Sequence, residues 1–151
     1  MANPKTRETA VHVTGVRELL KALSKIDKDL QAEVRDASKD IATDLVSGAK
    51  NAAATPLQNK VAGGLKVKRD RVPVVSASGN VDGIPMRDIF YGAEFGGQRR
   101  PTTQQFAPHQ DRRGYFLYPT ARARGRHYAA LWADAVDQAF KAWDYRAPKG
   151  L

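Results

Sequence analysis

The chain has 151 residues and carries 25 Lys and Arg against 16 Asp and Glu, a formal net charge of +9, with 42% hydrophobic residues and no cysteine. This length suits one domain with a real core, and the lack of cysteine excludes disulfides, Cys-ligated metals and thiol nucleophiles. No apolar run approaches the ~20 residues of a membrane span, and no signal-peptide pattern opens the sequence, so we expect a cytosolic setting without membrane contact.

The first third of the chain is predicted to be mainly helical. Residues 1–9 are typical of a flexible arm, and the Val-His-Val alternation within 10–14 predicts a short strand. Apolar residues then return every three or four positions from Val16 to Leu45, which predicts helices over about 16–26 and 29–52. A run of small residues and Pro56 end the second helix.

The middle of the chain changes to the alternation of strands. Residues 65–67 and 72–75 predict an antiparallel hairpin, and Pro73 places the second strand at an edge. Turn signals follow at 78–80 and 82–83. Residues 86–95 are apolar and aromatic and end in Gly96-Gly97, and a long loop is predicted over about 98–113.

The end of the chain predicts one more strand and one more helix. Residues 114–118 form a strand-like run, and Pro119 opens a helix whose apolar stripe includes Leu131, Trp132 and Trp143. Residues 146–151 are a loose tail. We therefore predict a single α+β domain over 10–145, with two N-terminal helices and one C-terminal helix packed on a small, mostly antiparallel sheet.

The excess positive charge is local, because residues 56–128 hold thirteen basic and five acidic side chains. Within this stretch, residues 99–126 hold seven arginines and no lysine, opposed only by Asp111: Arg99, Arg100, Arg112, Arg113, Arg122, Arg124 and Arg126. Guanidinium groups pair well with carboxylates and phosphates, and cations near a helix start oppose its dipole. This pattern predicts an anionic partner, either acidic side chains of a neighbouring subunit or DNA phosphates. The alternative is that these arginines lie on a solvated loop and helix start and bind no partner.

No catalytic pattern is visible. His12, His109 and His127 are isolated, and the chain has no phosphate-loop, dinucleotide-binding or hydrolase-elbow motif. Glu94, between Tyr91 and Phe95, is expected to be partly buried and either paired with an arginine or capping a backbone turn. A small hydrolase using Glu94 is a weaker alternative. We expect no enzyme activity, no metal and no cofactor.

Three segments, taken in order, carry a resemblance to a known family: the Gly-x-x-Glu-Leu opening of the first helix, a Tyr/Glu-Phe-Gly segment, and an aromatic-Leu-x-Pro entry to the last helix. The second segment contains Tyr91, Glu94, Phe95 and Gly96, and the third contains Pro119. The sequence resembles the neck or tail-completion (head–tail connector) family of long-tailed bacteriophages over about residues 11–143.

This resemblance implies a non-enzymatic virion protein that acts at the head–tail junction during tail assembly. The implied partners are further copies of the chain in a ring, expected to be hexameric, other neck and tail-tube proteins, and DNA passing through the channel without sequence-specific contact. The implied location is the virion, after assembly in the host cytoplasm.

In such a ring, the arginines of one subunit would meet the acidic face of the first long helix on its neighbour. That face consists of Asp27, Asp29, Glu33, Asp36, Asp40 and Asp44. A solvated helix face balanced by its own basic residues is the alternative for these acids. The alternative function is a basic nucleic-acid-binding module that uses the arginine cluster of residues 99–126.

Overall fold

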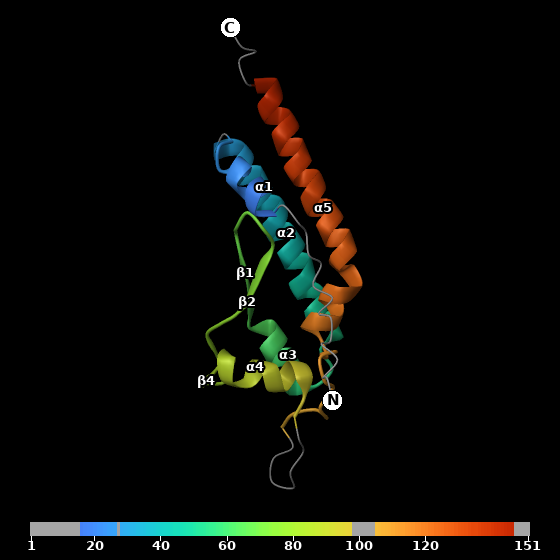
Figure 1. Ribbon diagram of the computed structural model, residues 1–151. Helices are drawn as coiled ribbons and strands as arrows, with labels where there is room; N and C mark the ends of the chain where they lie inside the picture. The colour runs from blue at the N-terminus through green and yellow to red at the C-terminus, as the bar shows by residue number, and fades with distance from the viewer. Residues whose placement is uncertain (1–15, 27, 98–104, 147–151) are drawn as a thin grey trace, which may run out of the picture.

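A long antiparallel pair of helices sets the shape of the molecule. The computed structural model describes residues 16–26, 28–97 and 105–146. In chain order the elements are α1 (Val16–Leu23), α2 (Lys28–Ala52), α3 (Pro56–Gly63), β1 (Leu65–Lys68), β2 (Val74–Ala77), β3 (Asn80–Val81), β4 (Ile84–Pro85), α4 (Met86–Phe95) and α5 (Leu117–Arg146). The paired helices are α2 and α5, with the β1–β2 hairpin beside α2 and the short helices α3 and α4 at the lower end (Figure 1).

The predicted α+β class is confirmed, although the described part of the chain is more helical than expected, with five helices. Its strands form two separate antiparallel pairs, β1 with β2 and β3 with β4. The predicted helix over 29–52 matches α2, and the predicted helix over 16–26 contains α1, which ends three residues earlier.

The α2–α5 pair buries the upper of two apolar cores. Leu30 and Val34 of α2 pack with Trp132 and Val136 of α5, and α1 closes the cluster with Leu23. Apolar residues spaced three and four apart put one stripe of each helix on this core. Lower down, Gly48 has no side chain, and α5 approaches α2 closely there with Thr120.

The β1–β2 hairpin is confirmed, with β2 beginning two residues later than predicted. Its register runs from Leu65 opposite Ala77 to Lys68 opposite Val74. The tip of the hairpin is tied to both long helices, because the carbonyl of Arg71 accepts from Trp132 Nε1 at 2.8 Å and from Ser38 Oγ at 3.1 Å. Two side chains on two helices therefore fix the position of one turn.

Helix α3 is not predicted from the sequence. Thr55 Oγ1 accepts from the Gln58 amide at 3.2 Å, and Gln58 Oε1 accepts from the Thr55 amide at 3.2 Å, with Pro56 at the first helical position. This reciprocal cap starts a new helix at the proline that ends α2.

One helix is not assigned by the sequence pattern, and one predicted strand is wrong. Residues 86–95 form the helix α4, whose Met86, Ile89, Phe90 and Ala93 are buried at helical spacing in the lower core. Residues 114–118 do not form a strand, because Leu117 already opens α5 and the chain turns before it at Gly114, where φ is +72°. Short apolar and aromatic runs fit a strand or a buried helix equally well, so periodicity alone does not assign either segment.

The last helix carries a third correction. Leu131 and Trp143 are 42% and 40% exposed, so they do not belong to the core stripe predicted for them. The C-terminal part of α5, which contains Trp143, extends beyond α1 and α2 (Figure 1). The predicted arm 1–9, the strand over 10–14 and residues 147–151 lie outside the described residues, while Arg146 is the last residue of α5.

Candidate interaction surface

The buried carboxylate of Glu94 joins α4 to α5. Glu94 has no exposed surface, and its Oε2 and Oε1 accept from the amides of Leu117 and Tyr118 at 3.0 and 2.9 Å. These are the first two amides of α5, which have no partner within the helix. Burial raises the pKa of Glu94 above its ordinary value, against the opposing effect of the backbone hydrogen bonds from Leu117 and Tyr118. Of the two roles predicted for Glu94, capping is confirmed, and no described arginine forms an ion pair with it.

Glycines allow the backbone to pass close to this carboxylate. At Gly114 a Cβ would collide with Glu94 Oε1, and at Gly96 it would collide with the Pro108 carbonyl; both residues have positive φ, +72° and +75°. Only glycine adopts these positions without strain. The Glu94-Phe95-Gly96 segment is thus explained as a helix end, a cap for the next helix and a reversal of the chain.

The chain on either side of residues 98–104 is tied together. Gly97 donates to the Ala107 carbonyl at 2.9 Å, and Gln110 donates to the Phe95 carbonyl at 2.8 Å. The ring of Phe106 lies against Gly92 of α4 and Gly97. The irregular conformation predicted for this region holds for residues 105–113, and its base is anchored on α4.

Aromatic side chains form a partly exposed patch beside this base. Tyr91 stacks on Phe95, with ring centroids 6.2 Å apart, and Phe95 lies 4.9 Å from Tyr118. Tyr91 is 64% exposed and Tyr118 41%. Tyr91 and Phe95 belong to the sequence motif of the resemblance, but the sequence analysis does not predict this patch. Their spacing of four on a helix would have indicated it, had α4 been predicted as a helix.

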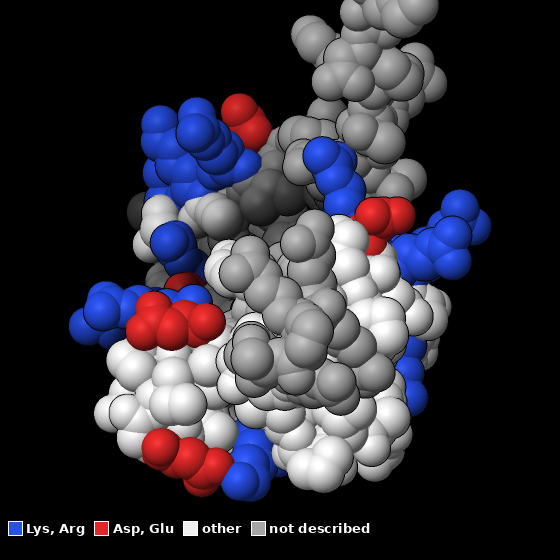
Figure 2. All heavy atoms as spheres, turned by 90° about the horizontal axis from the view of Figure 1, so that it is seen from below, with Lys and Arg blue, Asp and Glu red and all other residues white. Residues whose placement is uncertain are grey.

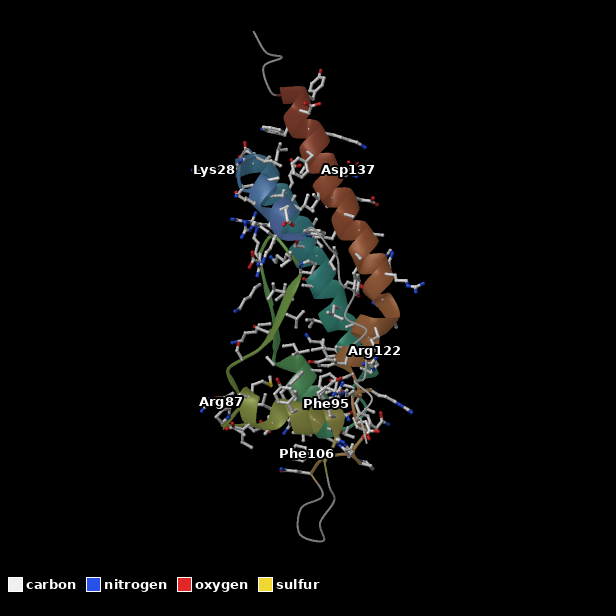
Figure 3. The ribbon with its side chains drawn as sticks, in the orientation of Figure 1. Lys28, Arg87, Phe95, Phe106, Arg122 and Asp137 are labelled. Atoms are coloured by element: carbon white, nitrogen blue, oxygen red, sulfur yellow. The ribbon has the colours of Figure 1, made fainter. Side chains whose placement is uncertain are left out.

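Three of the predicted arginines gather at the same end of the molecule. Arg112 and Arg113 are exposed, and with Phe95 and Asp111 they line a shallow hollow. Arg122 donates to the Arg112 carbonyl at 3.2 Å and to the Arg113 carbonyl, so it fixes the turn that presents the other two. Figure 3 places Arg122 near Phe95 and Phe106, with Arg87 on the other side of this end.

Arg124 and Arg126 lie further along α5. Arg124 Nη1 donates to Asp44 Oδ2 at 2.9 Å, and Tyr128 Oη donates to the same oxygen. The hydrogen bonds from Tyr128 and then Arg124 hold the pKa of Asp44 below its usual range. Arg126 is exposed further along α5, and Arg99 and Arg100 lie outside the described residues. The five described arginines of the predicted cluster therefore do not form one surface.

The acidic face of α2 is partly used within the chain. Asp44 binds Arg124, and Asp36 Oδ1 accepts from Arg69 Nε at 2.6 Å. Two of the acids predicted to meet a neighbouring subunit thus have partners in their own subunit.

We call the Tyr91, Phe95 and Tyr118 side chains, together with Arg112, Arg113 and Arg122, the end surface. Seen from below, basic side chains lie around the rim of the molecule with acidic ones between them (Figure 2). Among the described residues no three or more His, Asp or Glu are placed to hold a metal ion, and no described helix is long and apolar enough to cross a membrane. The end surface can bind a partner through aromatic and cationic contacts.

Comparisons with known proteins find no matching family model, no matching curated protein and no matching solved structure.

Proposed function

We propose that the protein is a structural component of the phage head–tail junction, where identical copies form a ring that joins the neck to the tail tube during assembly. The proposal starts from the resemblance carried by the order of the sequence motifs. The observation that supports it most is that Glu94, Gly96 and Pro119 belong to one joint between α4 and α5.

That joint presents the end surface for docking. Tyr and Arg are the residue types most enriched at protein interfaces, because they combine contact area with directional hydrogen bonds. Arg112 and Arg113 form no ion pair with another described residue and are available to carboxylates of a neighbouring copy or of a neck protein. In this proposal the protein acts by assembly and carries out no chemistry.

Immunogold labelling of intact particles that contain this chain tests the proposed location. Antibodies against the purified chain should place gold at the junction of head and tail in a single cluster per particle. Gold along the tail shaft or over the head would contradict the proposal. So would a chain that is present in lysates and gives no labelling of purified particles.

A nucleic-acid-binding module is the second candidate, favoured by the exposed Arg112 and Arg113 and by the local charge excess. The two candidates separate in a DNA titration over a salt series. A module that grips phosphates binds tightly as a monomer, and log K falls steeply with log salt. For the ring protein we expect weak binding with no sequence preference. Tight binding by a monomer would replace the first candidate with the second.

A further inference from the structure

An apolar groove runs between β2 and α5, with α2 as its floor. Its lower part is lined by Val75 and Ala77 on the β2 side and by Leu117 and Ala121 of α5. Its upper part, a hollow of about 700 Å³, is lined by Leu19 of α1 and by Trp132, Val136 and Phe140 of α5. Leu45 and Pro73 line both parts, so the two hollows are continuous.

One wall of this groove is an open strand edge. Among the described residues β2 pairs with β1 alone, so the backbone groups on its other edge have no strand partner there. An open edge beside an apolar groove suits an extended segment that adds main-chain hydrogen bonds and places alternate side chains in the groove.

A polar atom on the opposite face of β2 adds a second requirement. Ser76 Oγ is buried and has no hydrogen-bond partner among the described residues. Buried hydroxyl groups are nearly always hydrogen-bonded, and side chains on directly opposed strand residues are close enough to pair. The segment that fits this edge therefore has apolar residues on its groove face and a polar residue opposite Ser76.

We propose that residues 10–14 of the same chain, Ala-Val-His-Val-Thr, add to β2 as a third strand and fill this groove. Val11 and Val13 enter the groove, while His12 lies on the outer face opposite Ser76. At about 3.3 Å per residue, five extended residues cover a length similar to that of β2.

The position of α1 determines whether residues 10–14 can extend to β2 and in which direction they would run along it. Leu19, one turn into α1, already lines the groove, and Arg71 at the hairpin tip donates to the Leu20 carbonyl at 3.5 Å. The N-terminal half of α1 therefore lies beside the hairpin tip. A strand that arrives there along β2 comes from the Ala77 end and runs antiparallel to β2.

A disulfide scan of the full chain tests the proposal without interference, because the chain has no cysteine. The pair Val11→Cys and Ala77→Cys should form a bond within one chain, since opposed residues on one face meet the geometry of a disulfide. The matched control, His12→Cys with Ala77→Cys, places the two sulfurs on opposite faces and should stay reduced. Val13→Cys with Ala77→Cys covers a register shift of two residues.

Each result decides the question. A bond within the chain for either valine pair supports the proposal. A covalent dimer in place of it would overturn the assignment to the same chain and give the groove to a second copy. No bond for either valine pair, or equal bonding of the His12 control, would overturn the added strand.

Hydrogen exchange provides a second measurement that needs no new bond. In the double variant Val11→Asp with Val13→Asp, the β2 amides that are not bonded to β1 should exchange about tenfold faster or more. His12→Asp, in the same segment on the other face, should leave them protected. Unchanged exchange in the double variant would contradict the proposal.

Discussion

At the scale of single residues, one buried carboxylate determines how the two halves of the lower end meet. Glu94 satisfies the amides of Leu117 and Tyr118, which begin α5 and would otherwise be buried without partners. Capping of a backbone turn is one of the two roles that the sequence predicts for Glu94, because a carboxylate among aromatic residues needs a hydrogen-bond donor. The sequence could not identify the donors, since they lie more than twenty residues further along the chain.

Replacing Glu94 should therefore lower stability in graded steps. Glu94→Ala leaves two buried amides unsatisfied and opens a small cavity, so we expect a loss of about 2 to 4 kcal/mol in the free energy of unfolding. Glu94→Gln keeps one accepting oxygen and should lose about half as much. Urea titrations of the three proteins measure this order. An alanine variant as stable as the parent would show that the cap contributes nothing.

The same residue predicts a pH dependence. Because the pKa of Glu94 is raised in the folded state, the folded protein binds this proton more tightly than the unfolded chain does. The contribution of Glu94 is therefore greatest below the unfolded pKa of about 4.3 and declines as pH rises through the higher folded value. The stability difference between parent and Glu94→Gln should thus shrink from pH 4 towards pH 7. A difference that grows over this interval would contradict the assignment.

At the scale of elements, sequence periodicity predicted the long helices well and the short ones poorly. The stripes of α2 and α5 run over many turns, so spacing of three and four residues identifies them. Helix α4 has ten residues, most of them aromatic or apolar, and its identity depends on the core it packs against. Leu131 and Trp143 continue the α5 stripe at positions that are 42% and 40% exposed, and the spacing of apolar residues alone does not predict this exposure.

The crossing of α2 and α5 depends on a glycine. A Cβ at Gly48 would lie 2.7 Å from Thr120 Cγ2, so Gly48→Ala must push the helices apart. The strain of about 1–3 kcal/mol exceeds the gain in helix propensity, and we expect a net loss of about 1 kcal/mol.

Gly125 on α5 is the matched control for this substitution. A Cβ there meets nothing within 4 Å, so Gly125→Ala should instead raise stability by up to about 1 kcal/mol. Thermal unfolding compares the two variants with the parent. Equal shifts of both in one direction would show that the helix contact is not close.

At the scale of the whole molecule, the net charge of +9 is less informative than its placement. The arginines that look like one cluster in the sequence separate in space, because α5 carries Arg124 to Asp44 on α2 while Arg112 and Arg113 stay at the lower end. The end surface combines Arg112 and Arg113 with aromatic residues of α4. These residues lie together because Glu94 joins α4 to α5.

Charge reversal on this surface should disrupt assembly without unfolding the chain. In Arg112→Glu with Arg113→Glu, repulsion replaces attraction, and self-association should weaken about tenfold or more. Lys28→Glu, an exposed change at the far end of the molecule that Figure 3 labels, is the control and should assemble normally. Sedimentation velocity measures the association, and circular dichroism checks the fold. Normal assembly of the double variant would exclude these arginines from the subunit interface.

The proposed ring is the central claim, and the mass of the native assembly tests it most directly. Mass photometry of the full chain at moderate salt should show one discrete closed oligomer, expected to be a hexamer, with few intermediates. A particle that remains monomeric at every concentration, or that forms open assemblies of unlimited size, would contradict the account.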